Sequence, residues 1–274
     1  MSLLCCFRVL EPVGSSQWTF PETDDMVVPF LLAVQFLTRI PVPLRQEPSP
    51  SSLRWSTAFY PLVGGLVGLA CATVFSAALW ALPASVAALA AVATGILLTG
   101  ALHEDGLADY ADSLGVRGGR QRKLEVMRDS RIGVFGTLAL IIAVGGQVLL
   151  LASLPPLWAW HGLILAHLIS RMAALLAGHL LTPARSDGLG RSLALRTGAL
   201  QILLGLATCA AAVWWTQGWI IITALVLPWP LVLLLGLHAR LRLGGLTGDV
   251  LGAIIVVFHL ATYLGLALHL GRTP

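Results

Sequence analysis

Acidic residues are concentrated in one short segment of the chain. Six of its 13 acidic residues lie between positions 104 and 129, namely Glu104, Asp105, Asp109, Asp112, Glu125 and Asp129. If residues 103–112 are helical, Asp105, Asp109 and Asp112 occupy positions i, i+4 and i+7 and share one face, where their like charges repel. Hard divalent cations bind carboxylate oxygens, and Mg²⁺ is usually held by one or two of them together with substrate phosphates. The spacing therefore favours a cation site on this face over a merely solvated acidic run.

Basic residues follow directly after the acidic segment. They are Arg117, Arg120, Arg122, Lys123, Arg128 and Arg131, and the stretch ends in the sequence Met-Arg-Asp-Ser-Arg-Ile-Gly at 127–133. Arginine binds phosphate oxygens in a bidentate manner, so a carboxylate-held metal beside these side chains predicts a pyrophosphate site. Membrane topology alone is the alternative explanation for any single arginine of this stretch.

Three other positions carry polar groups that could serve the same site. His103 is a candidate base or metal neighbour, whereas the other histidines are expected to be packing or interfacial residues. Arg171 lies in an apolar segment, where an ionisable side chain marks a functional site or a structural ion pair. Asp249 either caps the last helix or binds a ligand. The sequence has no HExxH or GxxxxGK[ST] motif, which argues against a zinc protease and a P-loop enzyme.

The composition indicates that these segments lie in a membrane protein. Apolar residues make up 57% of the 274 residues and charged residues only 11%, whereas soluble domains carry about 25% charged residues. Spans are expected at 57–80, 83–102, 133–154, 157–180, 199–215, 218–237 and 250–270, because each is long enough to cross a hydrocarbon core of roughly 30 Å. A shorter run at 27–40 predicts a re-entrant or interfacial helix. The expected fold is an all-α polytopic transmembrane helical bundle with about seven spans.

Loops rich in arginine alternate with uncharged, partly aromatic loops along this pattern. The positive-inside rule places the basic loops in the cytoplasm and the tryptophans at the opposite interface. Topology therefore explains the net charge of +4, and no nucleic-acid partner is expected. Residues 1–25 are predicted to be a disordered extension or to precede the true start at Met26, and residues 26–274 to form a single membrane-embedded catalytic domain.

Five motifs give the chain a resemblance to cobalamin (5′-phosphate) synthase, also called adenosylcobinamide-GDP ribazoletransferase. They lie in family order at 36–43, 60–64, 103–112, 127–133 and 244–249. The acidic motif His-Glu-Asp-Gly-Leu-Ala-Asp-Tyr-Ala-Asp, followed by Met-Arg-Asp-Ser-Arg-Ile-Gly, is the most specific part of the match. The chain departs from the family pattern at 256–259, which is mostly apolar where a glutamate or another polar group is expected. No role beyond packing is therefore expected for the final helix.

The resemblance implies a Mg²⁺-dependent transfer from adenosylcobinamide-GDP to α-ribazole or its 5′-phosphate, with release of GMP, at the end of cobalamin nucleotide-loop assembly. We expect Asp105, Asp109 and Asp129 to hold the metal and Asp112 and His103 to act in catalysis. Arg128 or Arg131 is expected to contact phosphate, and Asp249 is a further candidate cofactor-binding residue. The expected location is the bacterial cytoplasmic (inner) membrane, with the active site on the cytoplasmic face. Membrane lipid and other corrinoid-pathway enzymes are the expected partners, and an oligomer is compatible with the sequence.

Two other classes of protein compete with this interpretation. A CDP-alcohol-type membrane phosphotransferase places similar aspartates at a cytoplasmic helix end, but it should show a DGxxAR pattern, and here Gly106 is followed by Leu-Ala-Asp. A transporter should carry ionisable groups near the middle of the membrane and show internal repeats. The chain shows no such repeat.

Overall fold

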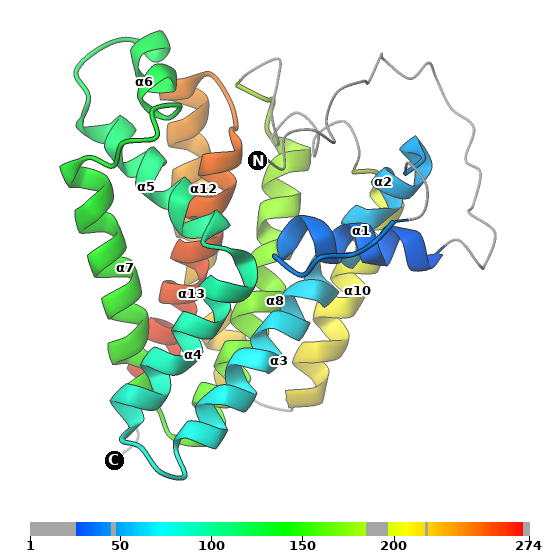
Figure 1. Cartoon of the computed structure of the whole chain (residues 1–274), viewed down its shortest axis with the longest axis vertical. Helices are drawn as coiled ribbons and strands as arrows, with labels where there is room; N and C mark the ends of the chain where they lie inside the picture. The colour runs from blue at the N-terminus through cyan, green and yellow to red at the C-terminus, as the bar shows by residue number, and fades with distance from the viewer. Residues whose placement is uncertain (1–25, 45–47, 185–196, 217–218, 271–274) are drawn as a thin grey trace.

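The computed structural model describes residues 26–44, 48–184, 197–216 and 219–270, and within these ranges the chain is a helical bundle (Figure 1). Its elements are α1 (Val27–Leu37), α2 (Pro50–Ser56), η3 (Thr57–Phe59), α3 (Tyr60–Ala78), α4 (Ala84–Thr99), α5 (Leu102–Gly115), α6 (Arg120–Val126), α7 (Val134–Ser153), α8 (Pro156–Leu180), α10 (Ala199–Thr216), α11 (Trp219–Val226), α12 (Pro228–His238), η4 (Ala239–Leu243) and α13 (Gly248–Leu270). Six described helical segments are long and apolar enough to cross a membrane, or seven when α4 and α5 count as one bent span. The prediction of an all-α bundle with about seven spans is confirmed.

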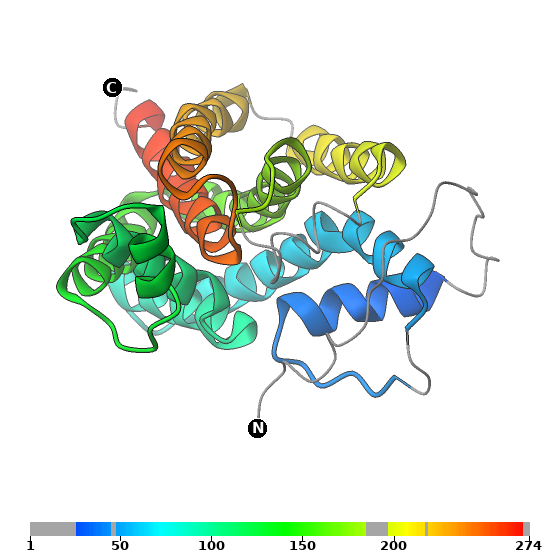
Figure 2. The same ribbon diagram turned by 90° about the horizontal axis from the view of Figure 1, so that it is seen from above.

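Helices α8 and α13 form the centre of the bundle. Helix α8 packs along α3, and α13 contacts α5, α7 and α8 (Figures 1 and 2). Within the most apolar stretch of each helix, 78% of the residues of α8 and 72% of those of α13 are buried, against 22% for α7 and 17% for α10. The outer faces of α7 and α10 expose leucine and isoleucine side chains such as Ile142 and Leu203. These faces have the character of a lipid-facing surface.

The two ends of the bundle differ in composition. At the end opposite α5 and α6, short connections follow α3 and α7, and α10 ends at Thr216. Trp80, just after α3, is 93% exposed, and Trp214, in the last turn of α10, is 81% exposed. Exposed tryptophans at the end of a span are typical of the boundary between lipid and water. The other end carries α5, α6 and the described loops that flank α6, which contain Arg117, Arg128 and Arg131 (Figure 1).

A sharp break separates α4 from α5. The span expected at 83–102 therefore does not continue as one straight helix into the acidic motif. Helix α4 ends at Thr99, and α5 leaves at an angle of 90°. Gly100 and Ala101 both have left-handed backbones, with φ of 67° and 58°. The Ala101 N–H donates to the Ile96 carbonyl (2.8 Å), as in a Schellman helix end. The acidic motif therefore forms a separate helix, whose first turn lies directly after the break.

Two other elements refine the predicted spans. Helix α1 has 11 residues, too few to cross a membrane, and it lies across α3 (Figures 1 and 2). The segment predicted as one span at 218–237 contains α11 and α12, which begins at Pro228 and continues into η4. Beyond η4 the chain pairs with the end of α8: the Leu246 N–H donates to the Thr182 carbonyl, and the Ala184 N–H donates to the Leu246 carbonyl, each at 2.8 Å.

Candidate active site

Helices α5 and α13 cross in close backbone contact. A Cβ built on Gly106 would lie 2.9 Å from the Asp249 carbonyl oxygen, and one built on Gly252 would lie 2.9 Å from the His103 carbonyl oxygen. Only glycine allows two backbones to approach this closely. The glycine in the acidic motif thus explains how Asp105 of α5 and Asp249 of α13 come to the same place.

A pocket of about 90 Å³ opens beside this crossing. Its polar wall consists of His103, Asp105, Asp249 and Arg171, from α5, α13 and α8. The remaining wall is largely apolar and comes from α1, α3, α8 and α13. The pocket therefore combines two carboxylates, a guanidinium and an imidazole with an apolar surface.

Both aspartates of the pocket lie in the first turn of a helix. Asp105 is in the first turn of α5, and Asp249 is in the first turn of α13. The capping alternative for Asp249 is not needed, because the Val250 N–H donates to the Thr247 hydroxyl (3.3 Å). The positive ends of two helix dipoles favour negative groups near them, whether carboxylate or bound phosphate.

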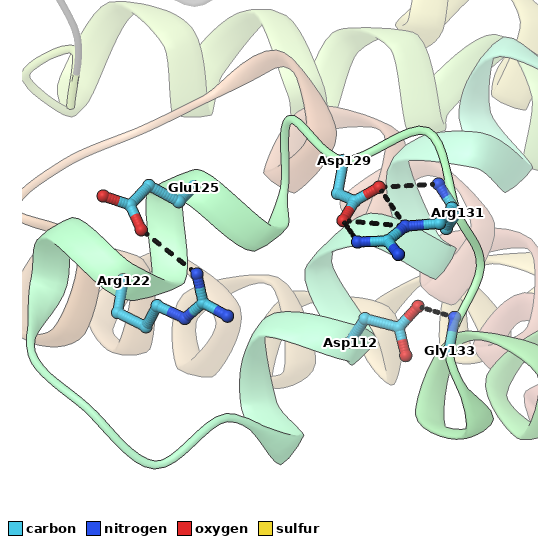
Figure 3. Close-up of polar contacts among 6 residues, drawn as sticks. All are labelled: Asp112, Arg122, Glu125, Asp129, Arg131 and Gly133. Carbon is cyan, nitrogen blue, oxygen red and sulfur yellow. Dashed lines mark hydrogen bonds and ion pairs between the residues drawn. The ribbon is translucent and has the colours of Figure 1, made fainter.

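Asp112 lies farther along α5 and caps another helix. Its Oδ2 accepts a hydrogen bond from the Gly133 N–H (2.7 Å) just before α7 (Figure 3). Its Oδ1 accepts one from the Gly136 N–H (2.8 Å) in the first turn of α7. A Cβ on Gly133 or Gly136 would collide with this carboxylate. The close approach of Asp112 therefore explains why the 127–133 motif ends in glycine. The catalytic role of Asp112 stays a prediction.

Asp129 pairs with Arg131 in the loop before α7. Its Oδ2 accepts from Arg131 Nη2 (2.6 Å) and its Oδ1 from Arg131 Nε (3.0 Å) (Figure 3). The hydrogen bonds from Arg131 lower the pKa of Asp129 to about 2. Arg128 lies in the same loop and is exposed. The proposed ligand and phosphate roles of this loop stay predictions.

The predicted metal ligands are distributed along α5 and the loop that follows it. Asp105 lines the pocket with Asp249, whereas Asp129 is paired with Arg131. Within the described ranges, no three or more His, Cys, Asp or Glu side chains are grouped closely enough to hold an ion. Two carboxylates in one pocket still fit Mg²⁺, which commonly takes its other ligands from substrate phosphates and water.

Behind the pocket lies a buried polar cluster of Arg171, His167, Ser170 and His259. Arg171 was singled out from the sequence, but the two histidines were expected only to pack or to lie at an interface. Arg171 is 2% exposed, and its Nη1 donates to His259 Nε2 (2.8 Å), Ser170 Oγ (3.0 Å) and His167 Nδ1 (3.2 Å). Because a guanidinium can only donate, both imidazole nitrogens must accept. The i, i+4 spacing of His167 and Arg171 was the available signal, but His259 comes from α13. The final helix therefore does more than pack.

A small cavity of about 10 Å³ adjoins this cluster and also touches His103 and Glu104, which leaves room for about one water molecule. The Nε2 of His103 and the Oε2 of Glu104 are buried and have no hydrogen-bond partner. His103 and Arg171 line both this cavity and the larger pocket. These two side chains thus connect the buried cluster with the pocket.

Two side chains of α6 fasten the charged end of the bundle. Arg120 Nη2 donates to the Ala184 carbonyl (2.6 Å), and Lys123 Nζ donates to the Ser113 carbonyl (2.7 Å) at the end of α5. These contacts give two of the basic residues a structural role.

Comparison with known proteins assigns the family. A family model described as cobalamin-5-phosphate synthase matches residues 29–267. The chain belongs to this family. All five motifs that carry the resemblance lie within the matched residues.

Relatives with the name adenosylcobinamide-GDP ribazoletransferase match most of the chain. One from Shewanella amazonensis is 38% identical over 248 residues, which cover 87% of this chain and 94% of the relative. One from Polaromonas sp. is 38% identical over 286 residues, which cover 90% and 99%. One from Bradyrhizobium diazoefficiens is 37% identical over 232 residues, which cover 84% and 89%. No solved structure matches the chain.

Proposed function

We propose that the protein transfers the adenosylcobinamide phosphate group of adenosylcobinamide-GDP to α-ribazole or its 5′-phosphate and releases GMP. Membership of the cobalamin-5-phosphate synthase family and the names of the relatives support this reaction. The single structural observation that carries it is the pocket in which Asp105, Asp249, His103 and Arg171 meet at the α5–α13 crossing. The product is adenosylcobalamin or its 5′-phosphate.

The reaction is an in-line displacement at phosphorus. The hydroxyl oxygen of the ribazole forms a bond to the phosphorus that carries the cobinamide, the bond from that phosphorus to the bridging oxygen breaks, and GMP leaves with the bonding electrons. Such a transfer depends mainly on positioning and charge stabilisation. The helix N-termini beside the pocket and the Arg171 guanidinium supply positive potential for the pyrophosphate.

The proton of the attacking hydroxyl needs an acceptor in the pocket. His103 lines the pocket, and its Nε2 has no hydrogen-bond partner. Both oxygens of Asp112 already accept backbone hydrogen bonds at the start of α7, so this carboxylate is engaged in holding that helix. We therefore assign the base to His103, and Asp112 holds α7 in place beside α5.

Mg²⁺ is the proposed cofactor. Asp105 and Asp249 would hold it in the pocket. Asp109 and Asp129 do not line this pocket and are further candidates from the sequence motif alone. When bound, it would neutralise charge on the pyrophosphate oxygens. Arg128 and Arg131 lie in the loop before α7 and are the proposed contacts for the phosphate of the leaving GMP.

The multi-pass bundle is proposed to lie in the bacterial inner membrane with α5 and α6 on the cytoplasmic face. The arginines of the described loops at that end support this orientation. Membrane lipid is proposed to surround the bundle. The protein is also proposed to associate with other corrinoid-pathway enzymes, and co-purification tests this association.

The test of the reaction is GMP release by the purified protein in liposomes. Adenosylcobinamide-GDP and α-ribazole are supplied together and singly, with Mg²⁺, and the nucleotide and corrinoid products are separated by chromatography. GMP and a ribazole-containing corrinoid should appear in equal amounts, and only when both substrates are present. GMP release without α-ribazole would indicate hydrolysis, and no release from folded protein would refute the function.

A further inference from the structure

The pocket at the α5–α13 crossing has a wall that the transfer chemistry does not use. This apolar wall consists of Phe36, Leu37, Tyr60, Leu175, Leu251 and Ile255. It faces the same space as Asp105 and His103. A ligand that fills the pocket must therefore carry an apolar group next to a group that reacts or binds a metal.

The aromatic part of this wall is fixed by packing. The rings of Phe36 and Tyr60 stack with centroids 5.5 Å apart and an interplanar angle of 12°. Phe36 belongs to α1, which lies across the bundle, and Tyr60 begins α3. A planar aromatic group can pack against such rings in an offset-stacked or edge-to-face arrangement. The wall thus suits a planar aromatic ligand.

We propose that this apolar wall binds the 5,6-dimethylbenzimidazole base of α-ribazole, with the ribose directed toward His103 and Asp105. The proposal rests on the proposed function and assigns one of its two substrates to a subsite. The base is planar, carries two methyl groups and has one nitrogen left to accept a hydrogen bond. Its burial against phenylalanine, leucine and isoleucine leaves few polar atoms without partners.

The other substrate groups fit this wall poorly. Guanine has several donors and acceptors on its edges, and burying them against apolar side chains would leave them unpaired. The corrin macrocycle carries amide side chains around its rim, and burying their donors and acceptors against this wall would likewise leave them unpaired. The chemistry of the wall therefore assigns the nucleoside base to it and leaves the corrinoid and guanine outside.

The first experiment compares two phenylalanines of α1. Phe36 lines the pocket, whereas Phe30 packs edge-on against Phe59 (5.8 Å) and is not part of the pocket lining. Both are half-buried, which makes Phe30→Ala a matched control for Phe36→Ala. Phe36→Ala should raise the KM for α-ribazole about tenfold, in line with the loss of one aromatic contact. The KM for adenosylcobinamide-GDP should stay within about twofold, and Phe30→Ala should change neither constant.

A second readout tests base recognition itself. The protein is given the riboside of unmethylated benzimidazole as the acceptor, and kcat/KM is compared with that for α-ribazole. Burial of two methyl groups should favour α-ribazole about tenfold. This preference should shrink in Phe36→Ala. In Phe36→Trp the larger side chain narrows the pocket, so the preference should shift further toward the smaller riboside. Because Phe36 lies on the peripheral helix α1, this variant also serves as the test if Phe36→Ala does not fold.

Equilibrium dialysis of radiolabelled α-ribazole against the protein in liposomes separates the two proposals. Binding that weakens in Phe36→Ala and not in Phe30→Ala supports the subsite, even if no GMP is released and the function fails. Normal GMP release with an unchanged KM for α-ribazole in Phe36→Ala overturns the subsite. An increase confined to the KM for adenosylcobinamide-GDP also overturns it and places the corrinoid substrate against the wall.

Discussion

The substitution Gly106→Ala tests the α5–α13 crossing most sharply. An alanine Cβ at this position would lie 2.9 Å from the Asp249 carbonyl oxygen and 3.0 Å from its Cα, whereas ordinary van der Waals contact begins at 3.4 Å. Both neighbours are backbone atoms and cannot rotate away. The two helices must therefore separate by about half an ångström, a distance at which overpacking costs about 1–3 kcal/mol.

The effect on activity should exceed the effect on stability. Alanine favours a helix over glycine by up to about 1 kcal/mol, which offsets part of the strain. A misplacement of about 1 Å can lower a rate about 100-fold, so a separation of half that size should lower kcat/KM for GMP release at least about tenfold. The thermal unfolding temperature in detergent should fall by only a few degrees, as expected for a net loss of about 1–2 kcal/mol.

Gly145→Ala is the matched control, because Gly145 also lies inside a helix but a Cβ added to it would have no atom within 4 Å. It should leave activity unchanged and the unfolding temperature equal or slightly higher. Equal activity of Gly106→Ala and the native protein would refute the argument that the crossing positions Asp105 against Asp249. Equal loss in both variants would show that the effect belongs to glycine and not to the contact.

Three further outcomes follow from the structure. Asp112→Ala removes the acceptor for two N–H groups at the start of α7 and should lower stability by about 1–2 kcal/mol, as measured by thermal unfolding in detergent. Arg171→Gln leaves the ring nitrogens of His167 and His259 without their buried donor and should lower stability by about 1–3 kcal/mol in the same assay, whereas no loss would contradict the buried network. The Asp129–Arg131 pair holds the pKa of Asp129 at about 2, below its usual 3.8. Any stability that the pair adds is therefore present above pH 3.8 and lost as the pH falls through 2. Carboxyl NMR titration should find a midpoint at about 2, and a midpoint near 4 would contradict the pairing.

The sequence was sufficient for the class of fold. Apolar length and loop charge predicted the span count because the bilayer imposes a fixed length on each span. The acidic motif was placed correctly at the end of a span. The break between α4 and α5 was not predicted, because residues with a side chain, such as Ala101, rarely adopt a left-handed backbone conformation.

Sequence patterns did not predict which distant segments contact one another. The partner of Asp105 in the pocket is Asp249, 144 positions later, and nothing in the spacing indicates that Gly106 and Gly252 let their helices touch. The histidines were expected to be scattered packing residues, but His167 and His259 meet around Arg171 because α8 and α13 lie side by side. Local periodicity reports the face of one helix and not which other helix covers it.

The most direct test of the account replaces one carboxylate of the pocket. GMP release from adenosylcobinamide-GDP and α-ribazole is measured over a range of Mg²⁺ concentrations for the native protein, for Asp105→Asn, and for Glu125→Gln, an exposed control on α6. The account predicts Mg²⁺-dependent release that Asp105→Asn abolishes and Glu125→Gln preserves, with all three proteins unfolding at similar temperatures. Release that persists in Asp105→Asn, or that needs no Mg²⁺, would contradict it.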